Sequence, residues 1–181
     1  MRYCKFIAFG LVLCALSCGN ASQKDSDSQH KSYECDLFSV DIPEGYYCKE
    51  AYNGLGPNEL IIGKDSLAPE KTIIMWSSEN IFPGTAEQFV SVITSQEIES
   101  FESSNSFYDV MTTDSTFVID GFPTFTISSI YTENGDTIIQ SRTGIVRPNE
   151  FYMMITQKCK ANKSEQELRL MFDIPSSIKF K

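Results

Sequence analysis

The body of the chain is a succession of short stretches in which apolar and polar residues alternate. Phe38, Val40 and Ile42 alternate with polar neighbours, which is the pattern of a strand with one buried face. Similar patterns predict further strands at 46–52, 59–63, 72–76, 107–119, 122–132, 137–147 and 151–158. Asn134-Gly135 predicts a tight hairpin, because a type I′ turn needs positive φ at both central residues.

Two segments carry the signature of a capped helix. Thr85 and Gln88 form a capping box, which predicts a helix over 86–101. Ser164 and Glu167 form a second capping box before another helical stretch. The spacing of the first helix predicts a core-facing side made of Phe89, Val92, Ile93 and Gln96.

The order of these elements is strands, helix, strands and a second helix, which Pro175 is expected to end. Helices segregated from an antiparallel sheet are typical of the α+β class. A length of 181 residues favours one domain with a sizeable core. The sequence therefore predicts a single α+β domain over residues 36–181, with an antiparallel sheet packed between or against two main helices.

The first residues have the pattern of a targeting segment. Arg2 and Lys5 precede the apolar run 6–16, which is too short to span a bilayer as a helix. The Leu-Ser-Cys-Gly-Asn around Cys18 resembles the lipobox of bacterial lipoproteins, of the Bacteroidota type in particular. The resemblance implies a signal peptide over residues 1–17, lipidation of Cys18 and an anchor in the cell envelope, which we expect to be the outer membrane.

Residues 18–35 are predicted to be a polar tether after that anchor. Ser, Asp, Gln and Lys dominate most of this stretch, and it lacks hydrophobic periodicity. Secretion without a lipid is an open alternative, because Gly19-Asn20-Ala21 is also a small-x-small cleavage signal. An uncleaved membrane anchor is the third alternative.

Charge and composition narrow the function classes. Twenty-four Asp and Glu oppose 15 Lys and Arg, and the net charge of −9 argues against nucleic-acid binding. His30 is the one histidine and lies in the tether, so histidine-based catalysis and metal binding are not expected. Glu97 and Glu99 cannot face each other at i, i+2 on a helix, and we interpret them as a solvated face. We expect no enzyme activity, catalytic residue, metal or cofactor.

Cys35, Cys48 and Cys159 are the cysteines of the folded body. Outside the cytoplasm, a disulfide between two of them is expected. A tight hairpin at residues 43–45 would separate Cys35 from Cys48 along the ladder and would favour Cys159 as one partner. A looser hairpin would allow a Cys35–Cys48 bridge.

Four aromatic residues form the remaining candidate site. Tyr46, Tyr47, Tyr52 and Trp76 fall near the ends of predicted strands, where binding residues often lie. A groove for a ligand or partner is one interpretation. Core packing is the more frequent reason for aromatic residues in such positions.

Three stretches together resemble the PsbP-like family. They are Phe38-Ser-Val-Asp-Ile-Pro-Glu-Gly-Tyr46, Val118-Ile-Asp-Gly-Phe-Pro-Thr-Phe125 and the closing Ser-Ser-Ile-Lys-Phe180. The resemblance covers residues 36–181 and implies an antiparallel sheet between helices and a noncatalytic role. Members of that family include a photosystem subunit, a Ran-binding import factor and many bacterial lipoproteins.

The expected function is therefore noncatalytic binding or assembly by a lipid-anchored envelope protein, acting on a protein or small ligand that the sequence does not name. The alternative is a secreted, disulfide-stabilised domain that binds or neutralises another protein, as immunity proteins do. A hydrolase using only Asp and Glu is a third class, and it requires two carboxylates that converge in one cleft.

Overall fold

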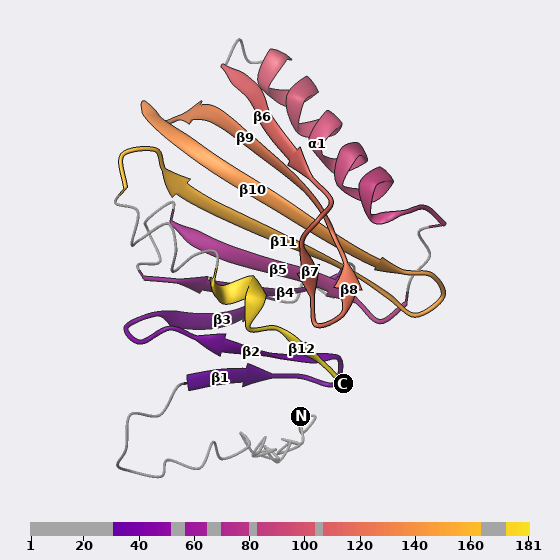
Figure 1. Cartoon of the computed structure of the whole chain (residues 1–181). Helices are drawn as coiled ribbons and strands as arrows, with labels where there is room; N and C mark the ends of the chain where they lie inside the picture. Colours follow the sequence, from indigo (N-terminus) through magenta and orange to yellow (C-terminus); the bar gives the residue numbers. More distant parts are fainter. Residues whose placement is uncertain (1–30, 52–56, 65–69, 80–82, 104–106, 164–172) are drawn as a thin grey trace, which may run out of the picture.

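The computed structural model describes residues 31–181 except 52–56, 65–69, 80–82, 104–106 and 164–172 (Figure 1). One long helix and a series of strands make up the described chain. In order they are β1 Lys31–Glu34, β2 Phe38–Ile42, β3 Tyr47–Ala51, β4 Asn58–Gly63, β5 Lys71–Ser77, α1 Ala86–Ser103, β6 Tyr108–Asp114, β7 Val118–Ile119, β8 Phe122–Pro123, β9 Phe125–Glu133, β10 Asp136–Arg147, β11 Phe151–Lys160 and β12 Lys179–Phe180.

A seven-stranded antiparallel sheet forms the frame of the domain, in the order β3-β4-β5-β11-β10-β9-β6. Strands β9, β10 and β11 form the predicted meander, and β11 then pairs with β5 to join the two halves. The hairpin between β9 and β10 turns at Asn134 and Gly135, whose φ values of 52° and 82° confirm the type I′ prediction.

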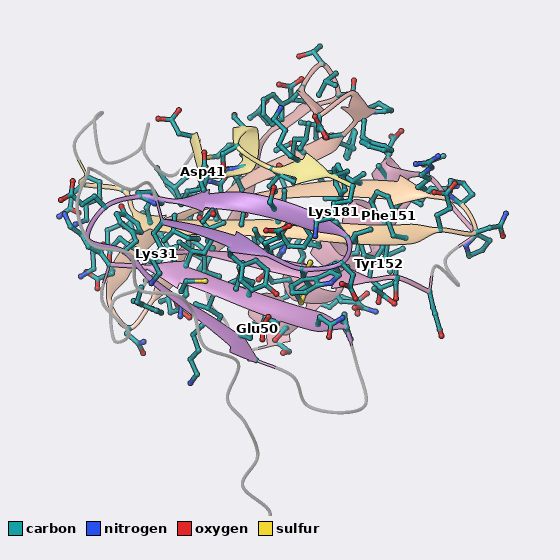
Figure 2. All side chains as sticks on the ribbon, turned by 90° about the horizontal axis from the view of Figure 1, so that it is seen from below. Lys31, Asp41, Glu50, Phe151, Tyr152 and Lys181 are labelled. Atoms are coloured by element: carbon teal, nitrogen blue, oxygen red, sulfur yellow. The ribbon has the colours of Figure 1, made fainter. Side chains whose placement is uncertain are left out.

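A smaller sheet, in the order β1-β2-β12, lies over the large one (Figure 2). Lys31 and Lys181 mark its opposite ends in that view. The predicted strands 38–42 and 46–52 do not form a hairpin, tight or loose: β2 pairs with β1 and β12, whereas β3 pairs with β4. The turn at Pro43 is present, because Tyr46 N donates to Pro43 O at 3.0 Å, but it passes the chain from one sheet to the other.

Strand β1 uses residues that the composition assigned to the tether. Lys31–Glu34 pairs with β2 along its whole length. Only Tyr33 contributes to the core, where its ring lies 5.9 Å from that of Phe38. A strand with three exposed polar positions has little hydrophobic periodicity, so the sequence pattern did not reveal it.

The two faces of the large sheet are covered differently. On one face, α1 packs on β9 and β10, with Val90 against Met154 and Ile127. On the other face, β2 packs with its Phe38, Val40 and Ile42 against the large sheet. That second core is completed by Leu60, Ile62, Ile74, Trp76, Ile119, Ile145, Phe151, Met153, Ile155, Ile174 and Ile178.

The capping box of α1 is confirmed. Thr85 N donates to Gln88 Oε1 at 2.9 Å, and Gln88 N donates to Thr85 Oγ1 at 3.3 Å. The predicted core face is confirmed in part: Phe89 and Ile93 pack against the core, whereas Val92 is 49 % exposed and the fully buried residues are Val90 and Thr94. The helix contacts the sheet closely at Gly144, where a Cβ would overlap with Cγ2 of Val90.

The second predicted helix begins at residues outside the described part of the chain. Its described end, residues 173–176, is helical and includes Pro175, so Pro175 does not end the helix as predicted. Ser177 N donates to Asp173 O at 3.1 Å just after it. The layers are thus α1, the large sheet, and a third layer in which a small sheet and this helical turn lie together.

The C-terminus is tied to the β7–β8 hairpin. Asp120, with φ of 48°, begins the hairpin turn, and its carboxylate accepts from Phe180 N at 2.8 Å. The Phe180 ring packs between those of Phe122 and Phe151, with centroids 4.7 and 4.9 Å away. In the described part of the chain, no helix is both long and apolar enough to cross a bilayer.

Candidate binding site: a hydroxyl-lined cavity

A row of small polar residues crosses four strands on the sheet face opposite α1. In this row Thr112 of β6 faces Ser128 of β9, which faces Ser141 of β10, which faces Gln157 of β11. Directly opposed residues of antiparallel strands point to the same face of the sheet. A second row beside it contains Asp114, Thr126 and Thr143.

These rows line a cavity of about 430 Å³, a size that suits a small ligand. Phe117 and the helical turn at residues 173–176 complete its wall. Within the described part of the chain, the lining residues are Thr112, Thr113, Asp114, Phe117, Thr126, Ser128, Ser141, Thr143, Gln157, Asp173, Pro175 and Ser176.

Several of the lining residues are nearly inaccessible although they are polar. Ser141, Thr143 and Gln157 are 7 %, 5 % and 4 % exposed. The hydroxyls bond across the strands, Thr126 to Thr143 at 2.9 Å and Ser128 to Ser141 at 3.5 Å. These four hydroxyl residues form the floor of the cavity. Each hydroxyl can both donate and accept, so the floor can form hydrogen bonds with a ligand in addition to these pairs.

The charge of the cavity is negative. Asp114 and Asp173 line it, and its described lining contains no Lys or Arg. Thr116 donates to Asp114 from its backbone N and from its hydroxyl, both at 2.7 Å, and these bonds lower the pKa of Asp114. An anionic ligand would meet repulsion here, whereas neutral hydroxyl groups would find acceptors and donors.

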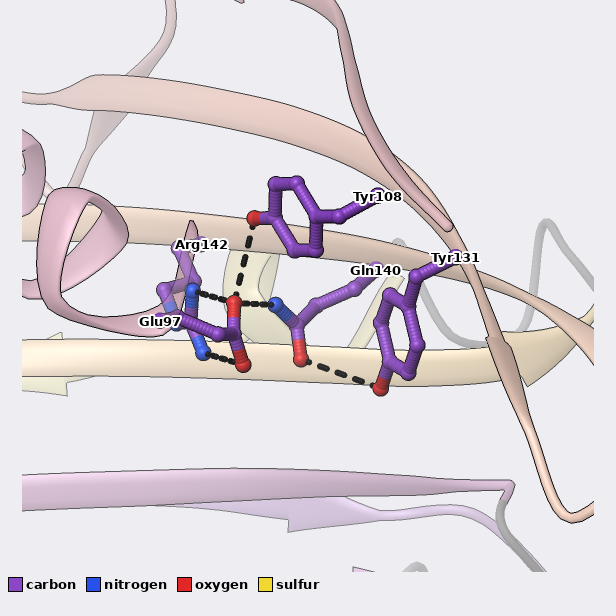
Figure 3. Close-up of polar contacts among 5 residues, drawn as sticks. All are labelled: Glu97, Tyr108, Tyr131, Gln140 and Arg142. Atoms are coloured by element: carbon purple, nitrogen blue, oxygen red, sulfur yellow. Dashed lines mark hydrogen bonds and ion pairs between the residues drawn. The ribbon is translucent and has the colours of Figure 1, made fainter. Parts of the chain in front are cut away.

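Strand β10 binds α1 on its other face, through a polar cluster around Glu97 (Figure 3). Arg142 donates to both carboxylate oxygens of Glu97, with Nη2 to Oε1 at 2.6 Å. Gln140 Nε2 and the Tyr108 hydroxyl donate to Oε2 of Glu97 at 2.9 and 3.0 Å. Tyr131 in turn donates to Gln140 Oε1 at 3.4 Å.

The electrostatics of this cluster favour an ionised Glu97. Burial by itself would raise its pKa, but the hydrogen bonds and charge of Arg142, helped by Gln140 and Tyr108, outweigh burial and lower the pKa of Glu97. Burial raises the pKa of Tyr108, and the Glu97 carboxylate adds to that rise. The cluster is a clamp between α1 and the sheet, in which each of the five side chains has a hydrogen-bond partner.

Comparisons with known proteins rest on structure alone. No model of a protein family matches this sequence, and no curated protein sequence matches it either. The solution structure of cyanobacterial PsbP (CyanoP) from Synechocystis superposes with a TM-score of 0.64 over 89 % of this chain and 99 % of that chain, at 9 % identity. The domain has the PsbP-like fold.

Two further solved structures are similar to a lower degree. LpqN of Mycobacterium tuberculosis, described as involved in cell envelope biogenesis, has a TM-score of 0.48 at 12 % identity over 80 % of this chain and 83 % of that one. A Bacteroides thetaiotaomicron protein has 0.47 at 12 % identity over 80 % and 45 %. The fold assignment rests on CyanoP, and a shared fold at such low identity says nothing about function.

Three of the four residues of the predicted aromatic site lie in the described part of the chain, and they occupy different places. Trp76 is 6 % exposed and packs edge-on against Phe38 at 5.1 Å, so it belongs to the core. Tyr46 and Tyr47 are half-buried, and the Tyr47 ring lies against Gly63. Across the sheet, Tyr47 is in register with Lys71 of β5. Lys71 is five residues, or about 17 Å, from Trp76 along that strand, so Tyr47 and Trp76 are far apart. Tyr52 lies outside the described residues.

The predicted disulfide is absent among the described cysteines. Cys35, Cys48 and Cys159 are all free thiols. Cys48 is in register with Gln157 three strands away, about 14 Å, so the Cys48–Cys159 pairing exceeds the span of a disulfide. Burial raises the pKa of the Cys48 and Cys159 thiols. Cys18 lies outside the described residues.

Sequence reasoning missed both the cavity and the clamp. Glu97 does not belong to a solvated face as interpreted, although Glu99 two residues on is exposed. The available signal for the cavity was the run of Ser and Thr at alternate positions of predicted strands, at 126, 128, 141 and 143. Such positions normally face solvent, and only the pairing of β9 with β10 shows that they line one cavity.

Proposed function

We propose that this protein is a lipid-anchored envelope protein whose PsbP-like domain binds a neutral, hydroxyl-rich small molecule such as a saccharide, without catalysing its conversion. The cavity floored by Ser128, Ser141, Thr126 and Thr143 is the single observation that carries the ligand part of this proposal. The lipobox-like residues around Cys18 support the anchor.

The chemistry of the cavity favours such a ligand over other classes. Paired hydroxyls match the alternating donors and acceptors of a sugar, and the carboxylates of Asp114 and Asp173 add two strong acceptors. Phe117 and Pro175 offer apolar surface for the C–H face of a ring. Phosphorylated or carboxylated ligands would lack a cation to pair with at this lining.

The ligand proposal is tested by NMR titration with a panel of neutral disaccharides, maltose, cellobiose and chitobiose, alongside glucose 6-phosphate. We expect saturable shifts of the amides at Thr126, Ser141 and Thr143 with at least one neutral sugar and none with the phosphate. The double variant Ser128→Ala/Ser141→Ala should weaken that binding about tenfold, because two hydroxyl partners are lost. Ser95→Ala, exposed on α1, is the matched control.

The anchor is tested separately, by fractionating cells that make the full chain or its Cys18→Ser variant. The full chain should be in the membrane fraction, with an intact mass that starts at Cys18 and includes acyl chains. Cys18→Ser should become soluble, since the domain would then lack its hydrophobic attachment. Membrane retention of Cys18→Ser would contradict the anchor but leave the ligand proposal standing.

A second candidate function follows from the two carboxylates at the cavity. Asp114 and Asp173 both line it, and a carboxylate-only glycoside hydrolase needs two carboxylates that face one cleft. Such enzymes also need one carboxyl with a raised pKa as the acid, and the pKa of Asp114 is lowered by Thr116. Turnover of p-nitrophenyl glycosides that disappears in Asp173→Asn, with binding retained, would replace the noncatalytic proposal.

A further inference from the structure

Strand β6 is an exposed edge of the large sheet. It pairs with β9 on one side and with no other described strand. Every residue from Asp109 to Asp114 is exposed. Large apolar side chains are among them or beside them, with Phe107 56 %, Val110 40 % and Met111 54 % exposed. An edge with open backbone donors and acceptors and apolar side chains is the geometry to which another strand can be added.

The part of the chain that contains β6 is acidic. Between Thr72 and Ser141 the sequence has ten Asp and Glu and no Lys or Arg. Asp109 and Asp114 flank the apolar positions of β6. The end of α1 lies against the start of β6, where the rings of Phe101 and Tyr108 are 5.1 Å apart, and it brings the exposed Glu102. Arg142, the first cation after this segment, is already paired with Glu97.

We propose that β6 is the docking edge for an extended, basic segment of a partner protein, which would add an eighth strand to the sheet. Backbone hydrogen bonds would provide the pairing, and apolar side chains of the segment would pack on Val110 and Met111. Lys and Arg at alternate positions would face Asp109 and Asp114, and opposite charges also steer the encounter. This surface is a second function of the domain, and it shares the Asp114 carboxylate with the wall of the cavity.

A second copy of this chain is the less favourable occupant. Pairing β6 with another β6 would bring acidic residues against acidic residues, which is repulsive. The ladder with β9 also shifts register between Val110 and Thr112. Charges and bulges at a sheet edge hinder its pairing with another edge. A basic strand would remove the charge repulsion, because its Lys and Arg would face acidic residues.

The test uses a labelled nine-residue peptide that alternates lysine and valine, measured by fluorescence anisotropy with the full domain. Two control peptides are needed: one alternates glutamate and valine, and one keeps lysine and valine but is N-methylated at every amide. The first lacks the charge complement, and the second lacks the donors of a strand. We expect the parent peptide to bind about tenfold or more tightly than either control, and to weaken as salt rises.

Variants of the domain locate the binding. Val110→Lys/Met111→Lys should weaken binding about fivefold or more, whereas Val92→Lys, a similarly exposed valine on α1, should leave it within about twofold. Hydrogen exchange of β6 amides should slow when the parent peptide is bound. Equal binding of the N-methylated peptide, equal effects of the two variants, or no binding at low salt would overturn the proposal. A dimer lost in Val110→Lys/Met111→Lys would overturn the choice of a basic partner.

Discussion

Ser141 and Arg142 are consecutive residues of β10 that act on opposite faces of the sheet. Ser141 lines the cavity, and Arg142 binds Glu97 of α1. The side chains of a strand alternate between faces, so one strand backbone carries both the cavity floor and the helix clamp. The Glu97–Arg142 ion pair therefore fixes the position of β10, which the ligand would contact, although the ion pair itself lies on the opposite face of the sheet.

The clamp should contribute strongly to stability. Glu97→Ala leaves the largely buried Arg142 without its partner, and we expect it to lower the free energy of unfolding by about 2 kcal/mol. Glu99→Ala removes the same side chain from an exposed position of the same helix and should change it by less than about 0.5 kcal/mol. Urea denaturation measures both; equal effects would mean that the ion pair contributes nothing beyond surface charge.

The same carboxylate predicts a pH dependence. Since the folded pKa of Glu97 lies below its ordinary value of 4.5, folding favours the ionised form, and the stabilisation is complete above 4.5 and lost as the pH falls through the folded pKa. The difference in unfolding free energy between the wild type and Glu97→Gln should be constant near neutral pH and shrink below pH 4.5. A difference that stays constant below pH 4.5 would contradict this prediction.

The close approach of α1 to β10 depends on Gly144. Gly144→Ala would place a Cβ in overlap with Val90, and we expect a loss of about 1–3 kcal/mol from overpacking. Because Val90→Ala removes the clashing methyl groups, the double variant should lose less than the sum of the two single variants. Additive losses in thermal denaturation would show that the helix moves away instead of clashing.

Thr72 is a site where a substitution should stabilise the protein. It is 1 % exposed, and its hydroxyl has no hydrogen-bond partner within the described part of the chain. Thr72→Val replaces that hydroxyl by a methyl group and should raise the unfolding free energy by about 1 kcal/mol. Thr143→Val, whose hydroxyl bonds to Thr126, should lower it. A destabilised Thr72→Val would imply that the hydroxyl is satisfied.

The three domain thiols should remain free even after purification from an oxidising compartment. Iodoacetamide labelling of the unfolded protein without reductant, followed by mass spectrometry, should modify Cys35, Cys48 and Cys159. In the folded protein, Cys159 should react slowest because it is buried and burial raises its pKa. A mass two units lower with two cysteines unlabelled would restore the disulfide prediction.

The sequence by itself determined most local structure, because local structure depends on near neighbours. The β2 strand, the Thr85–Gln88 capping box and the Asn134-Gly135 turn are all encoded within a few residues and all occur as predicted. The PsbP-like fold was also predicted, and the superposition with CyanoP supports it. The lipid anchor at Cys18 stays a prediction.

Strand pairing, and with it the candidate site, was decided only by tertiary structure. Alternation shows that Phe38–Ile42 is a strand, but it does not show that this strand and β3 lie in different sheets. The turn at residues 43–45 could connect two strands that pair with each other or two strands of different sheets. Glu97 is as polar as Glu99, and only the position of Arg142 across the helix–sheet interface makes it a buried partner. Hydroxyls 13 to 17 residues apart become one cavity floor only when β9 and β10 pair in register.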